Sequence, residues 1–240
     1  MRMPVFPELD VYDDTVARSA ALNMAVDEAL LEQATRPAIR FYRWDHPALS
    51  FGYFGKFSDI AQYGAERDLV RRWTGGGIVF HGKDLTYTIV IPASAGLFGE
   101  SSQAIYAAVH LALCEALRAK GSRAELAPAG VADYADAAVS DGRSSETEPR
   151  NFNACFASPV LADVLVDGKK VAGAAQRRTR RGLLHQGSIQ NVDISNGLAA
   201  AFASRLSGKC MAQQLDARLC TRASNLAALK YGTESWLQRR

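Results

Sequence analysis

Candidate strands in this chain come in consecutive runs, with helical segments before and after them. The segment 38–54 (AIRFYRWDHPALSFGYF) alternates in polarity and is rich in aromatic residues, which predicts two strands around a turn at 45–47. The segment 68–92 predicts a strand, a glycine loop, a strand, a turn at 82–84 and a further strand. Because runs of strands do not build alternating βα units, we expect an α+β fold with mixed or antiparallel sheets and flanking helices.

The flanking helices carry recognisable start and stop signals. Two aspartates at 13–14 precede apolar residues at helical spacing, and we expect them to cap and begin a helix over about 15–34. Two serines at 101–102 precede a longer helical pattern that is expected to end before Gly121. Two shorter helical patterns follow in the tail from about Asn196.

The composition is that of a soluble globular chain. Its 240 residues are 48% hydrophobic and 22% charged, so the chain can bury a core without disulfide staples. No internal repeat and no clear linker interrupt it, so residues 1–240 are expected to form a single domain. The net charge of +3 gives no general case for a nucleic-acid partner.

The chain also lacks the sequence signals of membrane, secreted and zinc proteins. No apolar run approaches the ~20 residues that a membrane-spanning helix needs, and no apolar signal segment follows the start, so we expect a cytoplasmic protein without a membrane partner. The cysteines are scattered and make no CxxC pair, which argues against zinc, and we expect no metal site. They are Cys114, Cys155, Cys210 and Cys220.

Three consecutive glycines, Gly75, Gly76 and Gly77, separate two predicted strands. Without Cβ atoms, this backbone can lie flat against a ligand or adopt positive φ. Two arginines at 71–72 precede the glycines and His81 follows them, a mixture suited to a carboxylate, a phosphate or an acyl-thioester oxygen. The pattern is neither a P-loop nor a dinucleotide fingerprint. The alternative is a strained turn with incidental charges nearby.

Cys155 precedes a predicted hairpin, and Lys170 lies on the second strand of that hairpin. Asp167 and Gly168 form the predicted two-residue turn, which places Lys170 opposite Leu165. A thiol near an amine can form a thiolate, and a thiolate can carry an acyl group. Cys155 would have to fold back over the sheet to approach the amine. The alternatives are a small buried cysteine and a solvated surface lysine.

The residues after Lys170 are small enough to leave room for a slender ligand, or to pack closely against a helix. They are Ala172, Gly173, Ala174 and Ala175. His185 is expected either to orient a ligand or to bond to backbone, while His110 is expected to be structural. The basic run 177–181 is expected to be a solvated turn or a docking point for an acidic partner protein.

Several motifs in order resemble one known superfamily. They are NMAVDEALL (23–31), RFYRWDHPALSFGYF (40–54), RRWTGGGIVFHGKDLTYTIVIP (71–92), DGKKVAGAAQRR (167–178) and LLHQGSI, which ends at Ile189. Over about 23–193 the chain resembles the lipoate-protein ligase A and octanoyltransferase superfamily. The resemblance implies a biotinyl/lipoyl-ligase-type catalytic domain that delivers an eight-carbon acyl chain, octanoyl or lipoyl, to one lysine of a lipoyl carrier domain.

The resemblance also implies roles for individual residues. Lys170 would touch the acyl carbonyl, and the arginine and glycine-loop residues would line the acyl or adenylate site. The substrate-binding residues implied in this way are Arg72, Gly75, Gly76, Gly77 and His81, to which the residue pattern described above adds Gly173, Ala174 and His185. Cys155 and Lys170 would be the catalytic residues.

Two chemistries occur in this superfamily. Ligases activate lipoate with ATP and Mg as an acyl-adenylate and need no cysteine, whereas many transferases hold octanoate on a cysteine. ACFASP (154–159) resembles the ACFxxP segment of the Gram-positive-type octanoyltransferases, in which the cysteine is the nucleophile. The chain ends without the extra C-terminal domain of many single-chain ligases, which also favours a transferase. Gly55 is a departure, because transferases often have glutamine after the GYF motif.

We therefore expect an acyltransferase that needs no cofactor. It would move an octanoyl or lipoyl group from acyl carrier protein, through a Cys155 thioester, to a lipoyl domain or a glycine-cleavage H-type protein. The first alternative is an ATP-dependent lipoate-protein ligase that acts through lipoyl-AMP. The second is a non-catalytic homologue that binds lipoate or an acyl carrier.

Overall fold

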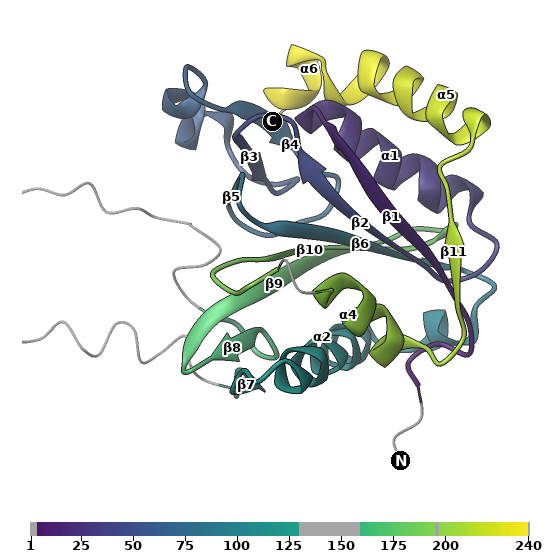
Figure 1. Cartoon of the computed structure of the whole chain (residues 1–240). Helices are drawn as coiled ribbons and strands as arrows, with labels where there is room; N and C mark the ends of the chain where they lie inside the picture. Colours follow the sequence, from purple (N-terminus) through teal and green to yellow (C-terminus); the bar gives the residue numbers. More distant parts are fainter. Residues whose placement is uncertain (1–3, 130–158, 195–196, 240) are drawn as a thin grey trace, which may run out of the picture.

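An eight-stranded mixed sheet lies between two layers of helices (Figure 1). The computed structural model describes residues 4–129, 159–194 and 197–239. The strand order is β11-β1-β2-β6-β10-β9-β8-β7, in which β11, β1 and β2 run parallel and the other neighbours are antiparallel. A second sheet has the order β4-β3-β5. The predicted α+β architecture with mixed sheets and flanking helices is confirmed.

The elements have the following bounds. The strands are β1 (Leu9–Arg18), β2 (Ala38–Trp44), β3 (Ala48–Phe51), β4 (Asp68–Arg71), β5 (Val79–His81), β6 (Leu85–Pro92), β7 (Ala124–Leu126), β8 (Val164–Val166), β9 (Lys169–Arg178), β10 (Gly182–Ile189) and β11 (Cys210–Gln213). The helices are α1 (Ala20–Gln33), α2 (Ser102–Ala119), α4 (Leu198–Leu206), α5 (Ala217–Leu226) and α6 (Glu234–Leu237). Short 3-10 turns cover Phe57–Asp59, Ala61–Tyr63 and Gly96–Gly99, and a π-helical turn covers Ala227–Tyr231.

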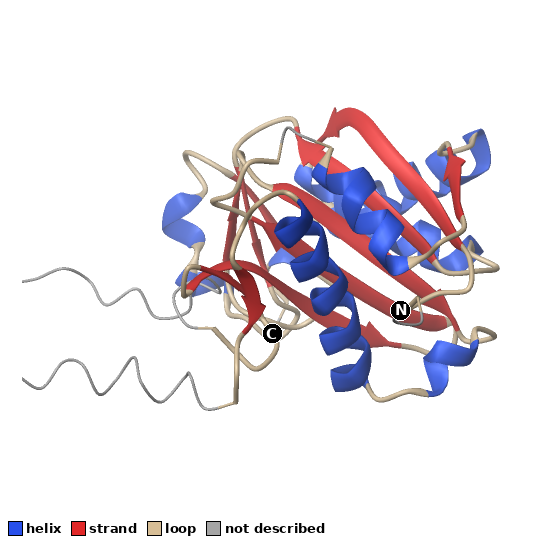
Figure 2. Cartoon of the chain, turned by 60° about the horizontal axis from the view of Figure 1, so that its bottom comes forward, coloured by secondary structure: helices blue, strands red, loops and turns tan. Residues whose placement is uncertain are grey.

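Helices pack on both faces of the large sheet. Helices α1 and α5 cover one face, and α2 and α4 cover the other (Figures 1 and 2). Neighbouring residues of β2 alternate between the two cores: Phe41 packs with α2 and α4, and Tyr42 packs with α1 and α5. Within the described residues, no helix combines the length and apolarity needed to cross a membrane.

The expected start of the first helix was wrong. Residues 9–18 form strand β1, and α1 begins at Ala20 with the Ser19 side chain as its N-cap. β-branched and aromatic residues favour the strand, which pairs in parallel with β2. Asp14 accepts hydrogen bonds from the Arg40 guanidinium on that neighbouring strand instead of capping a helix. The end near Ala34 and the α2 cap at Ser101 agree with the prediction.

The two strands predicted around residues 45–47 exist, but they enter different sheets. Strand β2 is central in the large sheet, and β3 pairs with β4 and β5 in the small one. After β3 the chain passes Gly52, where an added Cβ would lie only 2.0 Å from the Gly76 carbonyl oxygen. The glycine loop therefore crosses directly over the end of β3, and only glycine fits at that crossing.

The predicted β8–β9 hairpin is confirmed. Asp167 and Gly168 form its turn with φ of 49° and 76°, and Lys170 lies opposite Leu165. Strand β8 begins only at Val164, because the chain bends at Ala162, whose φ is 65°. Cys155 lies outside the described residues.

Candidate active site

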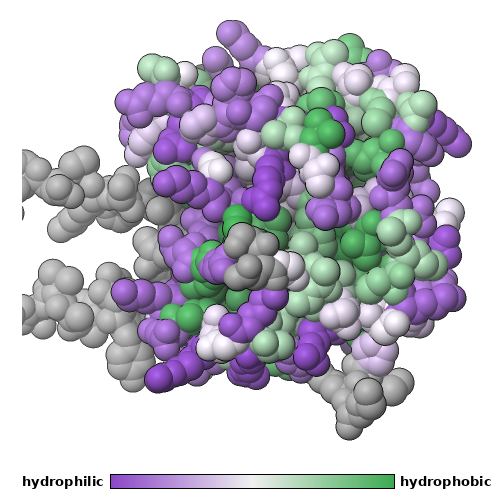
Figure 3. Space-filling model, in the orientation of Figure 1, coloured by the Kyte–Doolittle hydropathy of each residue, from purple (hydrophilic) through white to green (hydrophobic). Residues whose placement is uncertain are grey.

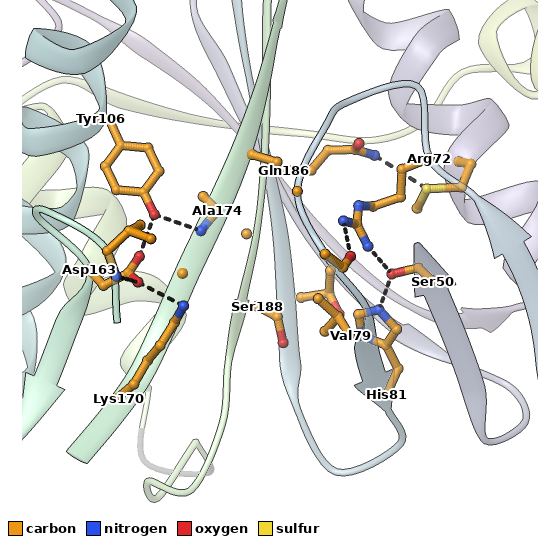
Figure 4. Close-up of a pocket in the computed structure, with 18 of the residues that line it drawn as sticks. Ser50, Arg72, Val79, His81, Tyr106, Asp163, Lys170, Ala174, Gln186 and Ser188 are labelled. Atoms are coloured by element: carbon orange, nitrogen blue, oxygen red, sulfur yellow. Dashed lines mark hydrogen bonds and ion pairs between the residues drawn. The ribbon is translucent and has the colours of Figure 1, made fainter. Parts of the chain in front are cut away.

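A cavity of about 310 Å³ lies between strands β9 and β10 of the large sheet and the small sheet. Figure 4 shows Lys170, Asp163 and Tyr106 on one side of it, and Arg72, Ser50 and His81 on the other. Apolar and small side chains make up much of the wall between them. They are Met24, Tyr42, Trp44, Val79, Val160, Gly173, Ala174 and Ala175.

A β-bulge turns Lys170 toward this cavity. Val164 pairs with Ala172 and Leu165 pairs with Lys170, so Val171 is an extra residue on β9. Paired residues share a face of the sheet, and an extra residue reverses the alternation of faces. Lys170 consequently lies on the same face of β9 as Gly173, which also lines the cavity, whereas Ala172 is buried in the hydrophobic core.

The Lys170 ammonium forms an ion pair with a buried carboxylate. Lys170 Nζ lies 2.7 Å from Asp163 Oδ2, and the side chains are 5% and 0% exposed. The Val160 N–H donates to the same oxygen at 2.7 Å. The Tyr106 hydroxyl donates to Asp163 Oδ1 and accepts from the Ala174 N–H at 3.0 Å. Burial, followed by the negative charge of Asp163, raises the pKa of Tyr106, so its hydroxyl keeps its proton.

Across the cavity, four polar side chains form a directed chain of hydrogen bonds. His81 Nδ1 lies 2.8 Å from Asp84 Oδ2, and His81 Nε2 lies 2.7 Å from Ser50 Oγ. Since an ionised Asp84 can only accept, Nδ1 carries the proton, and Nε2 accepts from the Ser50 hydroxyl. Ser50 Oγ accepts in turn from Arg72 Nη1 at 2.7 Å.

The charge state of this chain follows from burial. Burial lowers the pKa of His81 and outweighs the opposing effect of Asp84, which favours the neutral imidazole. Burial alone would raise the pKa of Asp84, but hydrogen bonds from His81, Ser188 and Gly82 lower it to about 2. The ring of Trp44 stacks on His81 with centroids 4.1 Å apart and holds its orientation.

Arg72 ties the glycine loop to this chain. Its Nη2 donates to the carbonyl oxygens of Gly75 at 3.0 Å and Gly77 at 2.8 Å. Gly76, with φ of 84°, and Gly77 line the cavity, and Gly75 does not. The neighbouring arginine is used elsewhere: Arg71 is buried and donates to five backbone carbonyls. These belong to Tyr53, Gly55, Trp236, Leu237 and Arg239.

A buried polar network forms the inner end of the cavity. Gln186 accepts from the Thr74 hydroxyl at 2.8 Å and donates to Asp27 Oδ2 at 2.7 Å. Asp27 is fully buried and forms an ion pair with Arg40 at 2.8 Å. Strand β10 is thereby linked through Gln186 to α1, which fixes the cavity wall from behind.

His185 lies behind the cavity, outside its lining, among structural side chains. Gln176 Nε2 lies 3.0 Å from His185 Nδ1, and His185 Nε2 lies 3.3 Å from the Tyr87 hydroxyl. That hydroxyl lies 3.1 Å from His110 Nε2, while His110 Nδ1 lies 2.7 Å from the Ala162 carbonyl. Burial lowers the pKa of both histidines, so both are neutral and can form one continuous chain of hydrogen bonds.

The basic run at 177–181 is used partly within the fold. Arg177 lies between the rings of Tyr53 and Trp73, 4.8 Å and 4.7 Å from their centroids. Arg178 donates to the carbonyls of Phe98 and Glu100. These two arginines therefore hold neighbouring loops, and only part of the run remains for a docking role.

Exposed hydrophobic residues lie at the cavity, and a small group of possible metal ligands lies elsewhere on the surface. Figure 3 shows hydrophilic side chains over much of one face, with hydrophobic patches between them. Val160, which lines the cavity, and Leu161 are exposed hydrophobic residues at 56% and 44%. Asp45, His46 and Asp68 bring ligand atoms within 4.8 Å of one another. All three are exposed and none lines the cavity, and groups of this kind are common without an ion.

The structure thus brings together most of the residues expected in the site. Lys170, Arg72, Gly76, Gly77, His81, Gly173 and Ala174 line one cavity, whereas Gly75 and His185 lie outside its lining, and Cys155 lies outside the described residues. Sequence reasoning missed Asp163, Tyr106, Ser50, Asp84 and Gln186 as site residues. Chemically, the cavity offers an ammonium and a glycine loop on either side of an apolar chamber, an arrangement suited to the carbonyl and chain of an acyl group.

Comparison with known proteins identifies a matching family and several relatives. The family model for the lipoyl protein ligase A/B catalytic domain matches residues 19–229. Octanoyltransferase LipM of Macrococcus caseolyticus is 37% identical over 181 residues, which cover 72% of this chain and 62% of that protein. LipM of Brevibacillus brevis is 36% identical over 193 residues, which cover 74% and 64%. The chain therefore spans somewhat less than two thirds of the length of these relatives.

Solved structures share the fold. A T. acidophilum protein classed with the lipoate protein ligases, solved with bound lipoic acid, superposes with a TM-score of 0.71 at 20% identity, covering 96% of this chain and 98% of that chain. A lipoate-protein ligase A bound with ATP gives a TM-score of 0.70 at the same identity and coverage. The fold expected from the motifs is confirmed.

Proposed function

The chain belongs to the family of lipoyl protein ligase A/B catalytic domains, and we propose that it is an enzyme that transfers an octanoyl group in protein lipoylation. The proposed route runs from acyl carrier protein, through a thioester on Cys155, to a lysine of a lipoyl carrier domain. The observation that carries the proposal is the single cavity that holds Lys170 opposite the glycine loop. The names of the relatives, octanoyltransferases at 36–37% identity, support the choice of acyl group.

The proposed chemistry has two balanced steps. In the first, the Cys155 thiolate attacks the octanoyl thioester; a C–S bond to Cys155 forms, the C–S bond to the carrier breaks, and the carrier thiolate leaves and takes up the proton that Cys155 had lost. In the second, the neutral amine of the acceptor lysine attacks the acyl-enzyme; an amide forms and the Cys155 thiol is released. Lys170 donates a hydrogen bond to the acyl carbonyl as negative charge develops on it. Because a thioester is converted to an amide, the reaction requires neither ATP nor a metal ion.

Cys155 and the cavity are linked by a short length of chain. Cys155 precedes Val160 by five residues, and Val160 lines the cavity. Covalent geometry keeps five residues within about 17 Å of extended chain. The apolar wall around Met24 and Trp44 suits a slender alkyl chain, and the neutral His81 adds no charge to it.

The proposed partners are two carrier proteins of the cytoplasm. The donor is an octanoyl–acyl carrier protein, and the acceptor is a lipoyl domain or a glycine-cleavage H-type protein. One structural neighbour is described together with its E2 lipoyl domain, which supports an acceptor of that class. Arg180 and Arg181 are exposed and can face acidic partner surfaces, and Arg181 also lies 3.7 Å from Glu32 at the surface.

The test is to incubate the protein with octanoyl–acyl carrier protein and measure its intact mass. We expect one octanoyl adduct that is absent in Cys155→Ala and present in Cys210→Ala, a matched control at an exposed cysteine. Absence of any adduct on the wild-type chain, with ATP-dependent lipoylation by Cys155→Ala, would establish the ligase chemistry instead. Binding of the acyl carrier without turnover in either assay would indicate a non-catalytic homologue.

A further inference from the structure

Asp163 has an environment that a merely structural carboxylate would not need. It is fully buried, yet its two oxygens accept from β9, from α2 and from the backbone of its own loop. Oδ2 accepts from Lys170 Nζ on β9 and from the Val160 N–H, each at 2.7 Å, and Oδ1 accepts from the Tyr106 hydroxyl on α2. A buried carboxylate is costly unless it is paired and hydrogen-bonded, and here every contact also constrains the lysine.

Tyr106 closes this arrangement into a ring. Its oxygen accepts from the Ala174 N–H at 3.0 Å, and Ala174 lies on the same strand as Lys170. The carboxylate is therefore fixed relative to β9 at two points, once through the lysine and once through the tyrosine. Such a closed ring leaves the ammonium little freedom to move along the cavity wall.

Gly173 provides the space for the ammonium. A Cβ at that position would lie 2.8 Å from Lys170 Cε, 3.0 Å from its Nζ and 3.2 Å from Asp163 Oδ1. The Lys170 side chain therefore crosses the face of Gly173 to reach Asp163. Together with the bulge at Val171, this crossing places the amine at one defined point of the cavity.

We propose that Asp163 and Tyr106 are positioning residues, which hold the Lys170 ammonium at the point where it meets the acyl carbonyl. The inference rests on the proposed acyl transfer. Neither residue needs to touch the substrate. Asp163 acts through the lysine that it pairs with, and Tyr106 acts through Asp163. A displacement of the amine by about 1 Å is enough to slow a well-oriented reaction about 100-fold.

The first experiment measures the lysine directly and needs no substrate. Competitive labelling with acetic anhydride, followed by peptide mass spectrometry, gives the reactivity of Lys170 relative to the exposed Lys169 of the same chain. In Asp163→Asn we expect Lys170 to react about tenfold faster than in the wild type, since the amine is then released from the ion pair that holds it against Asp163 and can reach the reagent. In Asp167→Asn, an exposed carboxylate of the same hairpin, we expect no change.

The second experiment measures transfer of the octanoyl group from the acyl-enzyme to a lipoyl domain. We expect Asp163→Asn to lower kcat about 100-fold with an unchanged KM for the lipoyl domain, because the residue is buried. Tyr106→Phe keeps the carboxylate and removes one hydrogen bond, so it should lower kcat about tenfold. Thermal unfolding identifies variants that are folded, and Tyr106→Phe serves if Asp163→Asn does not fold.

The two experiments distinguish a failure of the positioning role from a failure of the proposed acyl transfer. If the wild-type chain forms no acyl adduct, the proposed function fails, while the labelling of Lys170 still reports how the amine is held. If a folded Asp163→Asn variant shows wild-type labelling of Lys170, the positioning role is overturned. Altered labelling with wild-type kcat would also overturn it, because the position of the amine would then not matter to transfer.

Discussion

Gly173 sets the position of Lys170 by the side chain that it lacks. In Gly173→Ala the new methyl group would displace the end of a flexible lysine and leave the backbone in place. We expect acyl transfer to fall about 10- to 100-fold. The free energy of unfolding should change by less than about 1 kcal/mol, because the glycine has no positive φ to lose. Steady-state kinetics and urea denaturation of the same preparation provide the two measurements.

The matched control is Gly75→Ala, where an added Cβ meets no atom within 4 Å. Its transfer rate and stability should both stay close to those of the wild type. Equal losses of rate in the two alanine variants would contradict a specific effect on Lys170. A large loss of stability in Gly173→Ala alone would show that the space is needed for folding.

The site residues that the sequence predicted lie in short local motifs, whereas those that it missed reach the site through contacts between distant parts of the chain. Lys170, Arg72, Gly76 and Gly77 belong to short motifs, so local sequence was enough to select them. Tyr106 meets Asp163 across 57 positions of sequence, and such a contact leaves no local pattern. The bulge that turns Lys170 toward the cavity is equally invisible, because it depends on the register with β8.

At the scale of elements, Arg40 joins β1, β2 and α1. It is fully buried and forms ion pairs with Asp14 at 2.7 Å and Asp27 at 2.8 Å. Its guanidinium also donates to the Asn23 side chain at 2.7 Å. Replacing one partner leaves buried charges without compensation, so Arg40→Met should lower the free energy of unfolding by about 3–5 kcal/mol. Urea denaturation at neutral pH measures this.

Arg36→Met offers a matched comparison at the surface. Arg36 pairs with Asp10 at 3.0 Å but is 41% exposed, and we expect its loss to cost no more than about 1 kcal/mol. Similar costs for the two methionine variants would show that the Arg40 pairs are not effectively buried. This network also explains why β1 was taken for a helix start: Asp13 and Asp14 resemble a cap in sequence, whereas the Arg40 partner of Asp14 lies 26 positions away.

The α+β class was predictable at the element scale because runs of strands and the caps of α2 are local signals. The parallel edge β11-β1-β2 could not be predicted, since β11 lies about 200 positions from its partner β1 and is only four residues long. Short, half-exposed strands carry little periodicity, and their pairing is decided by the sheet that is already present.

At the scale of the whole molecule, buried neutral histidines make stability depend on pH. Burial, opposed by the hydrogen bond to Ala162 and the charge of Asp163, lowers the pKa of His110 from 6.5 to about 4. The folded state therefore resists a proton that the unfolded chain accepts, and stability falls as pH drops from about 6.5 to about 4. The shift corresponds to about 3 kcal/mol for this group. His81 and His185 act in the same direction.

Asp84 affects the stability of the fold at lower pH than the histidines do. Its pKa is lowered from 3.8 to about 2, so its contribution is complete above about pH 4 and is lost only as pH falls toward 2. Urea denaturation at pH 7 and pH 4.5 should show the histidine effect together with the onset of the effect of Glu8 and Glu32, whose pKa values are lowered from 4.5 by their cationic partners. His110→Gln should reduce the difference between the two pH values, while the exposed His46→Gln should not. An unchanged difference in His110→Gln would contradict the assignment.

In the proposed reaction, one cavity passes an acyl group from a thioester to a lysine. The most direct measurement isolates the octanoylated chain after reaction with octanoyl–acyl carrier protein and mixes it with an unmodified lipoyl domain, without ATP. We expect the octanoyl mass to leave the enzyme and appear on the lipoyl domain in a single turnover, and we expect this transfer to be lost in Lys170→Met. Modification of the lipoyl domain only when ATP and free lipoate or octanoate are supplied, at equal rate in Cys155→Ala, would contradict it.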